Sequence, residues 1–67
     1  MTHLIEYYPY NGDYTCIEPI YNGKDKQVIE YAQMKLKSAR NIYKKAVVQK
    51  YKEEDVLNPW SDLKVIE

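Results

Sequence analysis

The chain has 67 residues, of which 45% are hydrophobic and 30% charged, and ten basic and ten acidic side chains give a formal net charge of zero. This composition is unlike that of a disordered chain. The sequence contains no run of about eighteen apolar residues, so no membrane-spanning helix is predicted. A chain this short buries only about 60% of its unfolded surface, so we expect one marginally stable domain, residues 1–67.

Residues 1–23 predict a β-hairpin. The segments 3–8 and 14–18 are rich in β-branched and aromatic side chains, and Asn11-Gly12 between them favours a turn with positive φ. Pro9 cannot donate a ladder hydrogen bond, so it should mark the end of the first strand or a solvent edge.

Residues 24–54 contain no proline and no glycine and predict one long helix, which Asn22 or Asp25 can cap. About 28 helical residues span about 42 Å, whereas a compact chain of this length is only about 28 Å across. We therefore expect the helix to project from the domain or to pack against another chain.

One stripe of this helix carries small and large apolar side chains in alternation. It comprises Ile29, Ala32, Leu36, Ala39, Tyr43 and Ala46. Such a seam permits close helix packing, either on the chain's own sheet or across a homodimer interface. The sequence thus predicts self-association through Ala32, Leu36, Ala39, Tyr43 and Ala46, with packing on the chain's own sheet as the alternative.

Basic side chains form a ridge on the predicted helix. Lys26, Lys37, Arg40 and Lys44 fall within a strip about 60° wide, in line with Gln33 and Tyr51. Residues 24–52 carry a net charge of +7, whereas the segments on either side are acidic. The ridge is either a solvated face or a binding surface.

The tail, residues 55–67, begins close to the helix-breaking pair Asn58-Pro59. These residues either cap a short turn, or residues 63–66 return as a third strand. We favour the strand, because an isolated two-stranded hairpin is only marginally stable. Trp60 should fill the junction between tail and helix. The predicted fold is α+β: an N-terminal β-hairpin packed on one long α-helix, with a short C-terminal strand or turn.

The chain is unusually rich in tyrosine: it has eight tyrosines and no phenylalanine, and five of the eight tyrosines lie in residues 1–23. Tyrosine is enriched where proteins touch proteins, although it also serves as a border residue of a thin core. We select Tyr7, Tyr8 and Tyr10 as candidate partner-binding residues.

Chemistry-bearing side chains are scarce. His3 is the single histidine and Cys16 the single cysteine, so a Cys–His pair would depend on the hairpin geometry, and no metal-ligand spacing or phosphate-binding glycine loop is present. We expect no enzymatic activity, no cofactor and no metal. A lone cysteine and an N-terminus without signal-peptide features predict a cytoplasmic protein, in the host cytoplasm if the gene is viral.

Two function classes remain. The first is a small non-enzymatic protein-binding module, a regulator or inhibitor of the kind that phages and mobile elements encode, which uses the tyrosine-rich hairpin or the basic ridge. The second is a nucleic-acid-binding accessory protein that uses Lys26, Lys37, Arg40 and Lys44 on phosphates. The neutral total charge, the sequence pI of about 6.6 and the lack of a nucleic-acid-binding motif weigh against the second.

Overall fold

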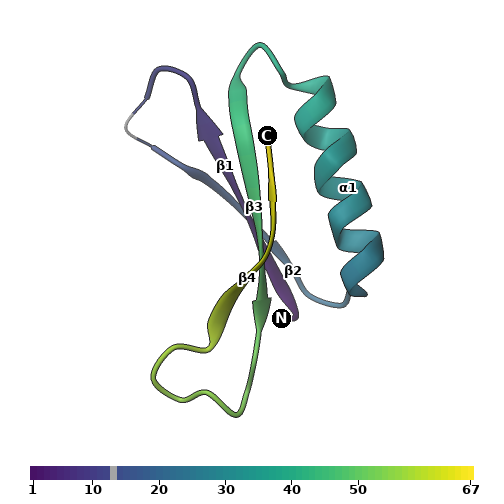
Figure 1. The fold of residues 1–67 in the computed structure, drawn as a ribbon, viewed down its shortest axis with the longest axis vertical. Helices are drawn as coiled ribbons and strands as arrows, with labels where there is room; N and C mark the ends of the chain where they lie inside the picture. Colours follow the sequence, from purple (N-terminus) through teal and green to yellow (C-terminus); the bar gives the residue numbers. More distant parts are fainter. Residues whose placement is uncertain (13) are drawn as a thin grey trace.

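The computed structural model describes residues 1–12 and 14–67 and shows an α+β fold of two layers (Figure 1), which confirms the predicted class. The elements are β1 (His3–Pro9), β2 (Cys16–Ile20), α1 (Asp25–Ser38), β3 (Tyr43–Tyr51) and β4 (Trp60–Ile66). The strands form one antiparallel sheet in the order β2-β1-β3-β4. The helix lies on one side of this sheet (Figure 1).

The predicted N-terminal hairpin is confirmed, but its turn differs from the prediction. β1 pairs with β2 in a register that runs from His3 opposite Ile20 to Tyr7 opposite Cys16. No glycine of the described residues has positive φ, so the predicted positive-φ turn at Asn11-Gly12 is wrong. Asp13 belongs to the same connection and lies outside the described residues.

The predicted extent of the helix, residues 24–54, is wrong. The helix ends at Ser38, residues 39–42 form a turn, and residues 43–51 form β3. β3 hydrogen-bonds to β1 on one side and to β4 on the other, and Val47 and Val48 at its centre suit a strand. A helix of 14 residues is about 21 Å long and matches strands of seven residues, about 23 Å, so the helix is no longer than the sheet and needs no second chain to cover it.

The core lies between α1 and the sheet. Its buried members are Ile5, Tyr7, Val28, Ala32, Leu36, Ala46 and Val48. The helix contributes one stripe, residues 28, 32 and 36, and two alanines with no exposed surface let the backbones of α1 and β3 approach closely.

This core corrects the predicted self-association seam. Ala32 and Leu36 lie on α1, whereas Tyr43 and Ala46 lie on β3, so the stripe does not exist as one helical surface. Ala32, Leu36 and Ala46 are buried inside the chain's own core, and Ala39 is a half-buried residue of the turn. A homodimer across that seam loses its physical basis.

The C-terminal segment is a strand, as favoured over a turn, although it begins at Trp60 and pairs with β3. A register shift opposite Val48 and Gln49 marks a bulge in this pairing. Within the part of the chain that the structure describes, no helix has the length and apolar character needed to cross a membrane.

Gly23, between β2 and α1, gives a test of this packing. A Cβ at this position would come within 2.6 Å of Val28 Cγ2 and 2.9 Å of Ile20 Cγ2. We expect Gly23→Ala to lower the free energy of unfolding by about 1–3 kcal/mol through overpacking, measured by urea denaturation. Gly12→Ala is the matched control, because on this exposed loop its Cβ would come close to the Pro9 ring alone, at 3.0 Å, and would make an ordinary contact with the Tyr14 nitrogen at 3.9 Å. Equal stability of the two variants would contradict the close packing at Gly23.

Candidate protein-binding surface

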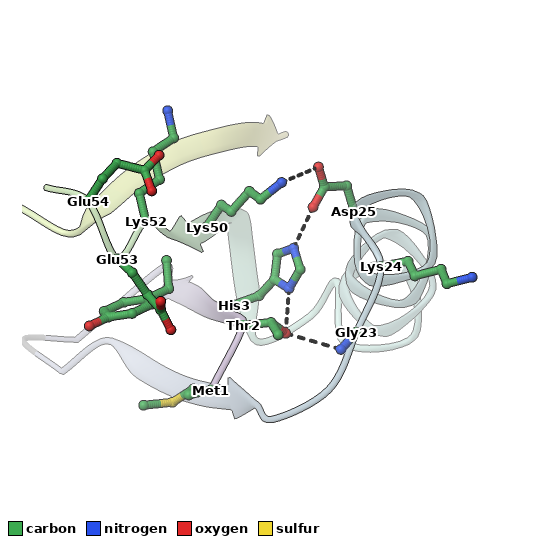
Figure 2. Close-up of a pocket in the computed structure, with 11 residues that line it drawn as sticks. Met1, Thr2, His3, Gly23, Lys24, Asp25, Lys50, Lys52, Glu53 and Glu54 are labelled. Atoms are coloured by element: carbon green, nitrogen blue, oxygen red, sulfur yellow. Dashed lines mark hydrogen bonds and ion pairs between the residues drawn. The ribbon is translucent and has the colours of Figure 1, made fainter.

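A polar cluster fastens the start of α1 to the sheet (Figure 2). His3, only 2% exposed, places Nε2 2.8 Å from Asp25 Oδ1 and Nδ1 2.8 Å from Thr2 Oγ1. Lys50 Nζ donates to Asp25 Oδ2 at 3.0 Å. The hydrogen bonds from His3 and then Lys50 hold the pKa of Asp25 below its usual range. The cluster therefore ties β1 and β3 to the first turn of the helix.

A shallow hollow of about 610 Å³ adjoins this cluster, and the His3, Asp25 and Lys50 side chains that line it bond to one another. Both ring nitrogens of His3 have partners, and Lys24 points away from the cluster (Figure 2). Cys16 lies opposite Tyr7, four residues along β1 from His3 and hence about 13 Å away, so the hairpin does not form a Cys–His pair. Among the described residues, no group of His, Cys, Asp and Glu suits a metal ion.

A second polar cluster fastens the middle of α1 to β2. The Glu18 carboxylate accepts hydrogen bonds from Tyr7, Tyr31 and Lys35, the last at 2.7 Å. Partial burial acts to raise the pKa of Glu18, but the hydrogen bonds from Lys35, Tyr31 and Tyr7 outweigh it and lower the pKa. The same contacts raise the pKa of Lys35, chiefly through the hydrogen bond to Glu18, and burial raises the pKa of Tyr7. Both clusters lie on the helix side of the sheet.

The other face of the sheet, the open face, is not covered by any described element (Figure 1). Because side chains alternate along a strand, the register assigns this face the residues that alternate with the core positions, and one of them, Val47, is only 7% exposed. The open face comprises Leu4, Glu6, Tyr8, Ile17, Pro19, Lys45, Val47, Gln49, Tyr51, Trp60, Asp62 and Val65. Most of its members are apolar or aromatic.

Contacts between neighbouring strands order the side chains of the open face. The rings of Tyr51 and Trp60 lie 5.0 Å apart at an interplanar angle of 60°. Lys45 Nζ lies 4.8 Å from the centre of the Tyr8 ring, and Gln49 donates to Asp62 at 3.1 Å. Aromatic side chains held in this way offer contact area at low cost in conformational entropy.

Exposed apolar side chains gather on this side of the molecule. The β1–β2 and β3–β4 loops both extend toward the side away from α1 (Figure 1). Among the described residues, eleven large apolar side chains are exposed, and seven of them lie on the open face or on these loops: Tyr10, Tyr14, Ile17, Tyr51, Val56, Leu57 and Val65. On α1 only Met34 is of this kind. A gathering of exposed apolar groups is typical of an interaction site.

Charged side chains are also distributed unevenly between the open side of the sheet and the helix side. The open face and the β3–β4 loop (residues 52–59) together hold five carboxylates and two lysines, a net charge of −3. The other described residues hold eight Lys or Arg side chains and four carboxylates, a net charge of +4. The neutral chain thus has an acidic, apolar side and a basic, polar side, although two of the five carboxylates, Glu53 and Glu54, line the hollow beside the start of α1.

The structure distributes the predicted tyrosine sites differently from the sequence analysis. Tyr7 is 1% exposed in the core, which corrects its selection as a partner-binding residue. Tyr8 is half-buried on the open face, and Tyr10 is exposed in the β1–β2 loop. Trp60 lies on the open face beside Tyr51, not at a junction with the helix.

The continuous basic ridge is also corrected. Lys26 and Lys37 lie near the two ends of α1, Arg40 lies in the turn and donates to the Glu67 backbone oxygen, and Lys44 lies on β3. Tyr51, expected in line with them, lies on the open face. The four basic side chains therefore do not form one strip on a single helix.

Two sets of residues at these surfaces were not predicted from the sequence. His3, Glu18 and Asp25 hold the helix on the sheet, and their pairing is non-local and leaves no spacing signal. Ile17 and Val65 are open-face residues of the edge strands, which alternation along a correctly placed β3 would have indicated. The chain was also compared with protein-family models, with curated proteins and with solved structures, and no match was found in any of the three.

Glu18 makes the stability of the fold pH-dependent. Because the pKa of Glu18 is lowered in the folded state, its contribution is present above the unfolded pKa of about 4.5 and is lost as pH falls through the folded pKa. We expect Glu18→Gln to lower the free energy of unfolding at pH 7 by about 1–3 kcal/mol and to have a much smaller effect near pH 2.

Denaturation with urea at both pH values measures this difference. Glu30→Gln, on the exposed surface of α1, is the control and should change stability by less than about 0.5 kcal/mol. A loss of stability in Glu18→Gln that is equal at both pH values would show that the carboxylate charge is not responsible.

Proposed function

We propose that this protein is a small non-enzymatic protein-binding module that regulates or inhibits a partner through the open face of its sheet. The observation that carries the proposal is the gathering of exposed apolar side chains on the helix-free side. Ile17 and Val65 on the open face are 55% and 45% exposed. Apolar side chains that remain this exposed add little to the stability of a monomer, and a group of them indicates a binding surface. Tyr51 and Trp60 add the aromatic pair that is common at the centre of protein interfaces.

The edges of the sheet are poorer candidates for binding. Addition of a partner strand needs a regular row of free backbone groups. β2 is five residues long and contains Pro19, and β4 has a bulge in its pairing with β3 and charged side chains at Asp62 and Lys64. Proline, bulges and charges are the features that protect sheet edges from pairing. The face of the sheet is the better binding surface.

Two exposed open-face residues on opposite edges of the sheet test the proposal. We expect Ile17→Ser with Val65→Ser to reduce retention of the partner from a lysate of the source cell at least tenfold, since two apolar contacts are lost. Met34→Ser, which removes a side chain 64% exposed on α1, is the matched control and should retain the partner as the unmodified chain does.

Quantitative comparison of the three eluates gives the measurement, with circular dichroism to check that each variant folds. The same protein retained equally by all three chains would show that the open face is not the binding surface. A loss confined to Met34→Ser would place the binding surface on the helix.

Nucleic-acid binding is the second candidate, and the +4 charge of the helix side is the observation that favours it. Binding through four phosphate contacts should weaken with salt at a log-log slope of about −3 to −4. We expect Lys37→Glu with Arg40→Glu to abolish such binding without loss of helicity, because both side chains are exposed and Arg40 contacts only a terminal backbone oxygen. If neither duplex nor single-stranded DNA or RNA binds the unmodified chain at low salt, this candidate is excluded.

A further inference from the structure

The β3–β4 loop, residues 52–59, presents the two most exposed large apolar side chains among the described residues. Val56 is 88% exposed and Leu57 is 97% exposed, and they are adjacent in sequence. Single exposed apolar side chains are ordinary on protein surfaces. These two differ because they lie together on a loop that extends toward the open side of the sheet (Figure 1).

The backbone of this loop is held by hydrogen bonds. The Lys52 N–H donates to the Pro59 oxygen at 2.7 Å and closes the base of the loop. Within it, the Asp55 N–H donates to the Lys52 oxygen at 3.2 Å, and the Asn58 N–H donates to Asp55 Oδ1 at 3.1 Å. A loop ordered before binding loses less conformational entropy on association than a free segment does.

The aromatic pair at the end of β3 and the start of β4 links this loop to the open face. Tyr51 and Trp60 are opposite one another in the register and immediately precede and follow the loop. Val56 and Leu57 therefore lie on the loop that joins the two strand ends carrying this aromatic pair, so a partner that binds the loop approaches the end of the open face.

Three carboxylates, Glu53, Glu54 and Asp55, immediately precede the apolar pair. None of them forms an ion pair with a described residue, and among the described residues their side chains make one hydrogen bond, which Asp55 accepts from the Asn58 N–H. Free carboxylates around an apolar pair favour a partner whose apolar pocket is bordered by Lys or Arg, and they disfavour an anionic partner surface.

A second copy of this chain fits the loop less well. Two copies that met through their open sides would bring together two surfaces of charge −3, which repel. The basic surface of a copy lies on its helix side, so contact with it would be head to tail and would not close into a dimer. The charges therefore favour a different protein.

We propose that the β3–β4 loop is the anchor of the binding surface: Val56 and Leu57 enter an apolar pocket of the partner, and Glu53 and Glu54 face basic side chains at its rim. This inference rests on the proposed function and adds the chemistry of the partner. The partner is a protein with an apolar pocket or groove bordered by Lys or Arg.

The probe is a synthetic helical peptide with a leucine stripe bordered by lysines, compared with a peptide of the same length in which glutamates replace the lysines. We expect the lysine peptide to bind, with amide chemical-shift changes in residues 52–60, and the affinity to fall as salt rises. The glutamate peptide should bind at least tenfold more weakly.

Two loop variants separate the apolar and charged contributions. Val56→Ser with Leu57→Ser should weaken binding of the lysine peptide at least tenfold and leave the salt dependence in place. Glu53→Gln with Glu54→Gln should remove most of the salt dependence and weaken binding severalfold at low salt. Met34→Ser is the matched control and should bind as the unmodified chain does.

The possible outcomes distinguish this inference from the proposed function. Failure of the lysine peptide to bind at low salt, or shift changes confined to α1, would overturn the inference. Shift changes on β2 and β4 that the loop variants do not alter would also overturn it, yet would leave the open face as the binding surface. Sedimentation that shows concentration-dependent association lost in the Val56→Ser, Leu57→Ser variant would identify a second copy as the occupant and overturn the choice of a foreign partner.

Discussion

The structure depends on the burial of one stripe of α1 against one face of a four-stranded sheet. Val28 and Leu36 fill the space over Ile5 and Val48, and the alanines of the helix and of β3 allow the close approach. A single helix of 14 residues can cover only one face of such a sheet. Every other property of the molecule that bears on binding follows from this one-sided cover.

The polar clusters decide which face is covered. His3 and Glu18 lie on the same face of the sheet as the apolar core, and each bonds to a side chain of α1, at Asp25 and at Lys35. If the helix lay on the opposite face, these buried groups would have to find new partners or lose their hydrogen bonds, which costs more than a lost surface contact. The clusters thus favour one arrangement of helix and sheet over its mirror alternative.

One-sided cover also explains why the charge distribution and the apolar distribution coincide. Half of the ten basic side chains lie on α1 or beside its ends: Lys24, Lys26, Lys35, Lys37 and Arg40. The open face keeps apolar and aromatic side chains in contact with solvent, and the loop that extends from it carries carboxylates. A partner with a basic, apolar surface would satisfy both features at once, while the helix side keeps the complex hydrated.

The sequence by itself determined the α+β class, the N-terminal hairpin and the start of the helix near Asp25, and it favoured a C-terminal strand without deciding between a strand and a turn. Each of these depends on local signals: β-branched and aromatic runs, turn residues and a breaker at Asn58-Pro59. The sequence did not determine where the helix ends, because residues 39–46 continue the helical spacing of apolar side chains and contain no proline or glycine. Only the tertiary structure decided that residues 43–51 are a central strand, since the hydrogen bonds that stabilise β3 come from β1 and β4, distant in the sequence. The open face was hidden for the same reason: which side of a strand is buried is settled when the strand acquires its neighbours and the helix takes one face.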